Sequence, residues 1–166
     1  MSFTADHARK LLLHARHSGR MPHALLITGT REVGTHDLVL ALAKEFNGAV
    51  ADQPENLRHP MCRILRPGPK SRRIPIEDVR AVEPFLALRA EAHETKLVVI
   101  LEADRMMDEP ANAFLKTLEE PPPQTLIILV TEQPSRLLPT ILSRCVRLDL
   151  RSATPGLHLS RVQELF

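Results

Sequence analysis

The sequence of 166 residues has no tryptophan, no tyrosine and only two cysteines, and each scarcity excludes a class of protein. With five phenylalanines as its only large rings, the chain has too few aromatics for the stacking platforms that bind single-stranded nucleic acid. Cys62 and Cys145 lie far apart without a CxxC motif or a Cys/His cluster, which excludes a disulfide framework and a four-ligand zinc site. We therefore expect a cytoplasmic protein that binds no metal.

Long apolar runs and an excess of one charge are also missing. Nothing in the sequence approaches the roughly 20 apolar residues that a membrane span requires. The N-terminal segment carries Asp6, His7, Arg9 and Lys10 and lacks the apolar stretch of a signal peptide. The net charge is +2, from 22 basic and 20 acidic residues, which excludes both a histone-like polycation and an acidic tail. Partners must therefore bind through local patches.

The chain does contain enough apolar material, 43% of its residues, for one core built from Leu, Ile, Val and Ala. We expect one domain over residues 1–166. Short apolar runs predict five strands, at Ala24–Thr28, Cys62–Leu65, Leu97–Leu101, Leu126–Val130 and Val146–Leu150. Helical periodicity predicts helices at Ala5–Ser18, His36–Phe46, Ile76–Leu88, with a kink or boundary at Pro84, from Asp108 to Leu118, and at Leu137–Leu142. The alternation predicts an α/β fold: a five-stranded parallel sheet flanked by helices.

The loop after the first predicted strand has the glycine spacing of a phosphate-binding loop, GxxxxGK[ST]. Gly29 and Gly34 match, with Arg31 between them, but Thr35 stands where the lysine should be and His36 where the hydroxyl should be. The cation and the magnesium ligand of such a loop are therefore both missing. The alternative is that the two glycines only permit a tight turn between strand and helix.

A phosphate-loop ATPase also needs an acidic pair at the end of a buried strand, where an Asp holds magnesium and a Glu activates water. Here Glu102 is present, but Leu101 stands at the Asp position. Asp104 is a possible substitute, although a surface or helix-entry carboxylate is the interpretation that we favour for it.

Several segments together resemble the AAA+ domain of bacterial DNA polymerase III clamp-loader subunits. The resemblance covers most of residues 5–150 and is most specific in the LEEPP sequence at 118–122 and in the Ser143-Arg144-Cys145 triplet. Its other parts are PHALLITGTREVG at 22–34, IPIEDVRAV at 74–82, the strand ending in Glu102-Ala103-Asp104 and the run from Leu126 to Thr131. The family order implies that the first predicted strand lies in the middle of the sheet, beside the strand that ends at Thr131.

Within that family, degenerate nucleotide motifs combined with a retained Ser-Arg-Cys triplet are typical of the delta prime type of subunit. The resemblance therefore implies a non-catalytic, cofactor-free subunit that supports ATP-dependent loading of the sliding clamp onto primed DNA. Its partners would be subunits of the ATPase gamma/tau and delta types, with the clamp and DNA contacted through the complex, and the isolated chain would be a monomer or associate weakly.

By the same analogy, Arg144 would be an arginine finger that enters the ATP site of a neighbouring subunit. The alternative is an arginine that pairs with a carboxylate of its own fold. Thr131 matches the AAA+ position that senses the γ-phosphate, but a strand-end hydrogen bond is its simpler role. Lys70, Arg72 and Arg73 form a basic segment, which we interpret as a solvated loop rather than a DNA contact.

The chain also departs from the family. It has no cysteines between Asn47 and His59, where members commonly carry a zinc module, so we expect that module to be absent. The helical lid and the collar domain that normally follow are not expected in this chain either. Two other functions stay open at this point: an active AAA+ ATPase with an unorthodox site, and an unrelated α/β protein-interaction domain.

Overall fold

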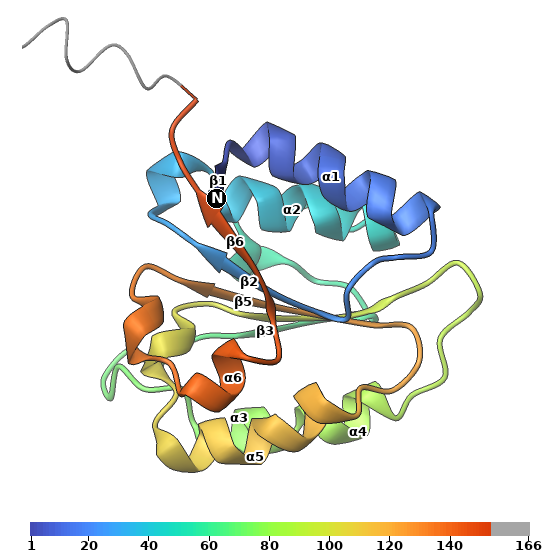
Figure 1. Cartoon of the computed structure of the whole chain (residues 1–166). Coiled ribbons are helices and arrows are strands. Elements are labelled where there is room, and N and C mark those ends of the chain that lie inside the picture. The colour runs from blue at the N-terminus through green and yellow to red at the C-terminus, as the bar shows by residue number, and fades with distance from the viewer. Residues whose placement is uncertain (154–166) are drawn as a thin grey trace, which may run out of the picture.

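The computed structural model describes residues 1–153 as one parallel sheet between two layers of helices (Figure 1). The strand order is β1-β6-β2-β5-β4-β3, and every pairing between these strands is parallel. Their bounds are β1 Ser2–Phe3, β2 Ala24–Thr28, β3 Cys62–Leu65, β4 Lys96–Ile100, β5 Thr125–Thr131 and β6 Val146–Leu150. As expected, β2 lies in the middle of the sheet beside β5, which ends at Thr131.

The prediction of five strands was wrong by one, because the sheet has six strands within residues 1–153. The additional strand β1 contains only Ser2 and Phe3, which pair with Asp149 and Leu150 of β6. Two residues are too few to show an alternating pattern, so only the tertiary contact with β6 reveals this strand.

The helices of the structure fall close to their predicted positions. They are α1 Ala5–His17, α2 Thr35–Asn47, α3 Ile76–Arg80, α4 Val82–Leu86, α5 Asp108–Glu119 and α6 Pro139–Leu142, with short 3-10 turns η1 Arg31–Val33, η2 Pro54–Asn56, η3 Ala103–Arg105 and η4 Pro134–Arg136. The helix predicted over Ile76–Leu88 is divided at Ala81. Pro84 explains the division, because it has no N–H to donate to the Arg80 carbonyl and its ring clashes with that group.

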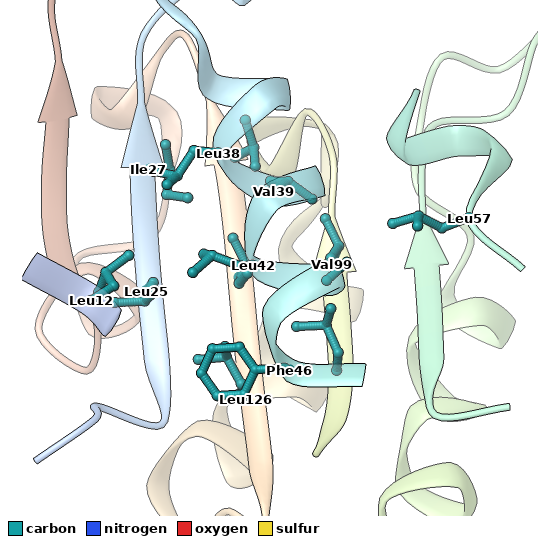
Figure 2. Close-up of a cluster of buried hydrophobic side chains, with 14 of the residues drawn as sticks. Leu12, Leu25, Ile27, Leu38, Val39, Leu42, Phe46, Leu57, Val99 and Leu126 are labelled. Carbon is teal, nitrogen blue, oxygen red and sulfur yellow. The ribbon is translucent and has the colours of Figure 1, made fainter. Parts of the chain in front are cut away.

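The two faces of the sheet bury separate apolar clusters. On one face, α1 and α2 pack their inward residues, among them Leu38, Leu42 and Phe46, against Ile27 and Val99 (Figure 2). On the other face, α3 to α6 cover the alternate strand residues with Phe85, Phe114 and Ile141. The strands β2 and β4 are buried at every position, which is the pattern of a parallel sheet covered on both sides. These layers fix the loops at the two ends of the sheet, where the candidate site residues lie.

Candidate functional site

A cleft of about 390 Å³ lies at the carboxyl ends of the strands, where ligands bind in open parallel sheets. It is lined by Arg31, His36, Glu55, Leu101, Glu102, Asp104, Arg105, Glu132 and Gln133. The structure therefore brings the loop after β2 and the loop after β4 together, as the sequence predicts for a nucleotide-type site. Glu55, Arg105 and the Glu132-Gln133 pair were not among the predicted residues.

The glycines of the β2–α2 loop hold a conformation that other residues adopt only with strain. Gly29 has φ +138° and donates its N–H to the Thr131 carbonyl at 3.1 Å. Gly34 has φ +96° and directly precedes α2. A Cβ would stand 2.7 Å from Val33 Cγ2 at Gly29 and 2.8 Å from Ala5 Cβ at Gly34. The turn from strand to helix therefore requires both glycines, whether or not a phosphate binds there.

The two polar residues at the start of α2 both form hydrogen bonds with residues of the β2–α2 loop. Thr35 is buried, and its Oγ1 donates to the Thr30 carbonyl at 3.3 Å. His36 accepts a hydrogen bond at Nδ1 from Arg31 Nε at 3.1 Å, which requires the neutral ring. Burial, and secondly the positive charge of Arg31, lower the pKa of His36. The imidazole is therefore neutral near pH 7 and adds no positive charge to the loop.

Arg31 is held by a glutamate that sequence reasoning missed. Its NH2 lies 3.1 Å from Oε1 of Glu55, which belongs to η2 in the stretch without periodicity between α2 and β3. Glu55 Oε2 is buried and has no hydrogen-bond partner among residues 1–153. No local signal marks Glu55 in the sequence, because the contact joins two loops that are 24 positions apart.

The loop after β4 presents a leucine and two carboxylates. Leu101 is buried, whereas Glu102 is exposed with a left-handed backbone at φ +48°. Asp104 accepts a hydrogen bond from Thr131 Oγ1 at 2.5 Å, and the same hydroxyl oxygen accepts the Gln133 N–H at 3.0 Å. The Thr131 hydroxyl is thus engaged with local groups, which is the simpler role considered for it from the sequence.

Carboxylates outnumber cations in this cleft. Within the described part of the chain, two guanidinium groups, those of Arg31 and Arg105, line it together with the carboxylates of Glu55, Glu102, Asp104 and Glu132. Among the described residues there is no group of three or more His, Cys, Asp or Glu side chains that could hold a metal ion. The arrangement has little electrostatic attraction for a triphosphate, which carries about four negative charges at neutral pH.

The Ser143-Arg144-Cys145 triplet lies at the other end of the sheet. It follows α6 and precedes β6, so it stands where β6 begins, whereas the cleft stands where the parallel strands end. A strand rises about 3.3 Å per residue, so the length of β6 alone separates the two ends by roughly 16 Å. The structure therefore does not bring Arg144 together with Gly29, Gly34 or Leu101.

Arg144 is bound by three groups of its own chain. Its NH2 lies 2.7 Å from Glu119 Oε1, while its NH1 donates to the Thr140 carbonyl at 2.7 Å and to Ser143 Oγ at 3.3 Å. Glu119 ends α5 and belongs to the LEEPP sequence, so the two most specific parts of the family resemblance meet in this pair. The Arg144 side chain keeps 32% of its surface exposed.

Cys145 is half-buried, and burial raises the pKa of its thiol to about 11. The thiol is therefore protonated at neutral pH, which argues against a nucleophilic role. Its side chain packs against the cluster beneath α5 and α6.

A family model and two relatives of known name indicate the same family. The family model described as DNA polymerase III, delta subunit, matches residues 4–154. The DNA polymerase III subunit delta' of Bacillus subtilis is 36% identical over 158 residues, which cover 88% of this chain and 47% of that protein. The corresponding subunit of Escherichia coli is 33% identical over 149 residues, covering 81% of this chain and 44% of that protein. The chain thus spans about half the length of these relatives.

Solved structures agree with the fold. A DNA polymerase III gamma subunit-related protein from Thermotoga maritima superposes with a TM-score of 0.62 at 28% identity, covering 98% of this chain and 50% of that one. The RuvB Holliday junction branch migration motor of the same organism superposes at 0.53 with 15% identity, over 88% of this chain and 44% of that one, and shows the fold alone. Within residues 1–153, no helix is long and apolar enough to cross a membrane. On the family match and these identities, the chain belongs to the DNA polymerase III delta subunit family and is similar to its delta' members.

Proposed function

We propose that the chain is the AAA+ module of a non-catalytic clamp-loader subunit, which completes the ATP site of a neighbouring subunit through Arg144 and has no working ATP site of its own. The observation that carries this proposal is the separation of the two features. Arg144 lies at the amino ends of the strands and the cleft lies at their carboxyl ends. A finger in this position can reach a γ-phosphate only on another molecule.

The chemistry of the cleft supports the non-catalytic part of the proposal. Thr35 and His36 replace the lysine and hydroxyl of a phosphate loop, and Leu101 replaces the magnesium-binding aspartate. The cation of the β2–α2 loop, Arg31, is already paired with Glu55. Apart from Arg105, which lines the cleft from the loop after β4, the remaining attraction for phosphate comes from the N-terminus of α2, which contributes roughly 0.3–1 kcal/mol in exposed settings and does not replace the missing lysine.

The relatives support the choice of partners. DNA polymerase III delta' and tau subunits are both similar to this chain, the tau subunit of Bacillus subtilis at 29% identity over 170 residues. We propose that the neighbour receiving Arg144 is an ATPase subunit of the tau/gamma type. A delta-type subunit, the sliding clamp and primed DNA would be reached through the assembled complex.

Calorimetric titration with ATP and magnesium tests the non-catalytic part and separates it from an active ATPase. The chain is expected to give no saturable heat at micromolar ATP, whereas a tau-type subunit under the same conditions serves as the positive control. Magnesium-dependent binding in the micromolar range would overturn this part of the proposal. Binding of sulfate or phosphate alone near Gly34 would not, because the N-terminus of α2 suffices for a weak anion site.

A further inference from the structure

The strand β3 forms one edge of the sheet, and among residues 1–153 it pairs with no strand other than β4. On its outer side the Cys62 N–H donates to the His59 carbonyl at 3.1 Å, and the Cys62 carbonyl accepts from Arg63 NH1 at 2.9 Å. The carbonyls of Met61 and Leu65 accept hydrogen bonds from β4 and from the residue after it, at 2.8 and 2.9 Å. Since the N–H and C=O of one strand residue point to the same side, the backbone groups of Ile64 point away from the sheet. Within residues 1–153 they make no hydrogen bond.

A groove of about 370 Å³ runs beside this edge. Its lining consists of Glu55, Leu57, Arg58, His59, Cys62, Arg63, Ile64 and Arg66. Leu57 stands beside β3 in Figure 2 but is only 4% exposed, so the half-buried Ile64 gives the groove its accessible apolar surface. The groove therefore combines open backbone hydrogen-bonding groups with an apolar surface, which are the two requirements for adding a strand to a sheet edge.

The charge of the groove is strongly positive. Among residues 1–153, Arg58 and Arg63 donate only to backbone carbonyls, and Arg63 also lies over the Phe85 ring at 4.3 Å. Neither these two nor Arg66 forms an ion pair with any described carboxylate. The one carboxylate in the lining, Glu55, is paired with Arg31. The three guanidinium groups are thus available to an acidic ligand.

We propose that the β3 edge docks an extended acidic segment of a partner protein, which adds to the sheet as a further strand beside Ile64. The open N–H and C=O of Ile64 would supply the main-chain hydrogen bonds. The guanidinium groups of Arg58, Arg63 and Arg66 would select acidic side chains. The proposal rests on neither the cleft chemistry nor Arg144, so it can fail while the proposed function stands.

A short charged edge strand can also protect a sheet from unwanted pairing, and this is the competing explanation. A synthetic peptide of about eight residues with alternating glutamate and valine, blocked at both ends, distinguishes the two, since strands of five to six residues are the common length. We expect titration into the ¹⁵N-labelled full chain to shift the amide signals of Ile64 and Arg66. Replacement of glutamate by lysine in the peptide is expected to weaken binding by about tenfold or more.

Backbone and charge contributions are separated by matched variants. Ile64→Pro removes the outward N–H, which an edge strand tolerates, and is expected to abolish binding while the circular dichroism spectrum stays unchanged. Arg66→Glu is expected to weaken binding by about tenfold, whereas Arg20→Glu, the same charge change at an exposed position after α1, should have little effect. A peptide N-methylated at alternate residues should not bind, because it cannot donate to the edge.

Three outcomes would overturn the proposal. The first is no binding of the acidic peptide at millimolar concentration. The second is equal binding of the N-methylated peptide or by the Ile64→Pro variant, either of which would leave a merely electrostatic patch. The third is tighter binding of a short thymidine oligonucleotide with the same amide shifts, which would assign the groove to nucleic-acid phosphates.

Discussion

Arg31 and Arg144 are both ion-paired to a glutamate of the same chain, yet they lie in very different surroundings. Solvent exposure does not explain the difference, because Arg31 is the more exposed of the two: 57% of its side chain is accessible, against 32% for Arg144. The groups around each arginine differ instead. Arg31 lies in a cleft with four carboxylates, whereas within the described part of the chain Arg144 pairs with one carboxylate, that of Glu119, at the opposite end of the sheet. Arg31 of the β2–α2 loop is thus engaged within its own cleft, whereas the proposed function assigns Arg144, at the α6–β6 junction, to the ATP site of a neighbouring subunit.

The largest effect should come from the loop that holds Arg31. Gly34→Ala is expected to lower the free energy of unfolding by about 2 kcal/mol or more, because a left-handed backbone costs an alanine roughly 1–2 kcal/mol and crowding adds to it. Gly48→Ala is the matched control, since Gly48 has φ +66° and a Cβ added there would meet no atom within 4 Å. Urea denaturation checks both variants. Equal losses would show that contact with Ala5 does not constrain the loop.

A smaller effect should follow from releasing Arg31. Glu55→Gln is expected to destabilise the fold by about 0.5–1 kcal/mol, because solvent screens the pair at Arg31, which is 57% exposed, although Glu55 is only 21% exposed. Glu32→Gln, at an exposed position of the same loop, is the control. If Arg31 were a latent phosphate ligand, Glu55→Gln would create measurable ATP binding, and that result would show that Arg31 is not confined to its internal ion pair.

Removal of the Arg144 side chain should lower the free energy of unfolding by less than Glu55→Gln does. Arg144→Ala is expected to cost between about 0 and 1 kcal/mol, since a single, partly exposed ion pair at an element end contributes little. Thermal unfolding beside Arg20→Ala measures the difference. A loss of several kcal/mol would instead identify Arg144 as a structural residue that joins α5 to α6.

The smallest expected effect is a pH dependence of the folding stability that arises from His36 in the β2–α2 loop. The pKa of His36 is lowered in the folded chain by burial and then by Arg31, while Glu55, Asp37 and Glu102 act against the shift. As the pH falls through the ordinary value of 6.5, His36 is therefore protonated in the unfolded chain before it is protonated in the folded chain. The free energy of unfolding consequently decreases on acidification. His36→Gln should give a flatter stability profile between pH 7 and pH 5. A profile parallel to that of the unmodified chain would contradict this assignment.

Most of the sheet could be predicted from the sequence because buried parallel strands are continuous apolar runs. Ala24–Thr28, Cys62–Leu65 and Val146–Leu150 match the observed strands at both ends. The strand at Ser2–Phe3 could not be predicted, since two residues carry no periodicity and the pairing depends on β6. A kink or boundary in the helix after β3 was expected, because Pro84 removes a helical hydrogen bond to Arg80, and the structure shows the break at Ala81.

The site was predictable only where its residues adjoin one another along the chain. The β2–α2 loop and the residues after β4 follow motif spacing, and the structure brings them into one cleft. Glu55 and Glu119 act through pairs formed across 24 and 25 positions, and no single segment of the sequence contains both partners. The distance between Arg144 and the cleft is likewise a property of the parallel topology rather than of any motif.

The most direct test of the account is clamp-stimulated ATP hydrolysis by a complex reconstituted with a tau-type ATPase subunit, a delta-type subunit and the sliding clamp, at matched incorporation of each variant. An arginine finger contributes about 10³ to 10⁵ to the rate at its own site, so Arg144→Ala should silence one of several sites and lower total hydrolysis by that share, with clamp loading reduced further. Arg31→Ala should leave both rates at the level of the unmodified subunit. Unchanged hydrolysis and clamp loading with Arg144→Ala, or a comparable loss with Arg31→Ala, would contradict the account.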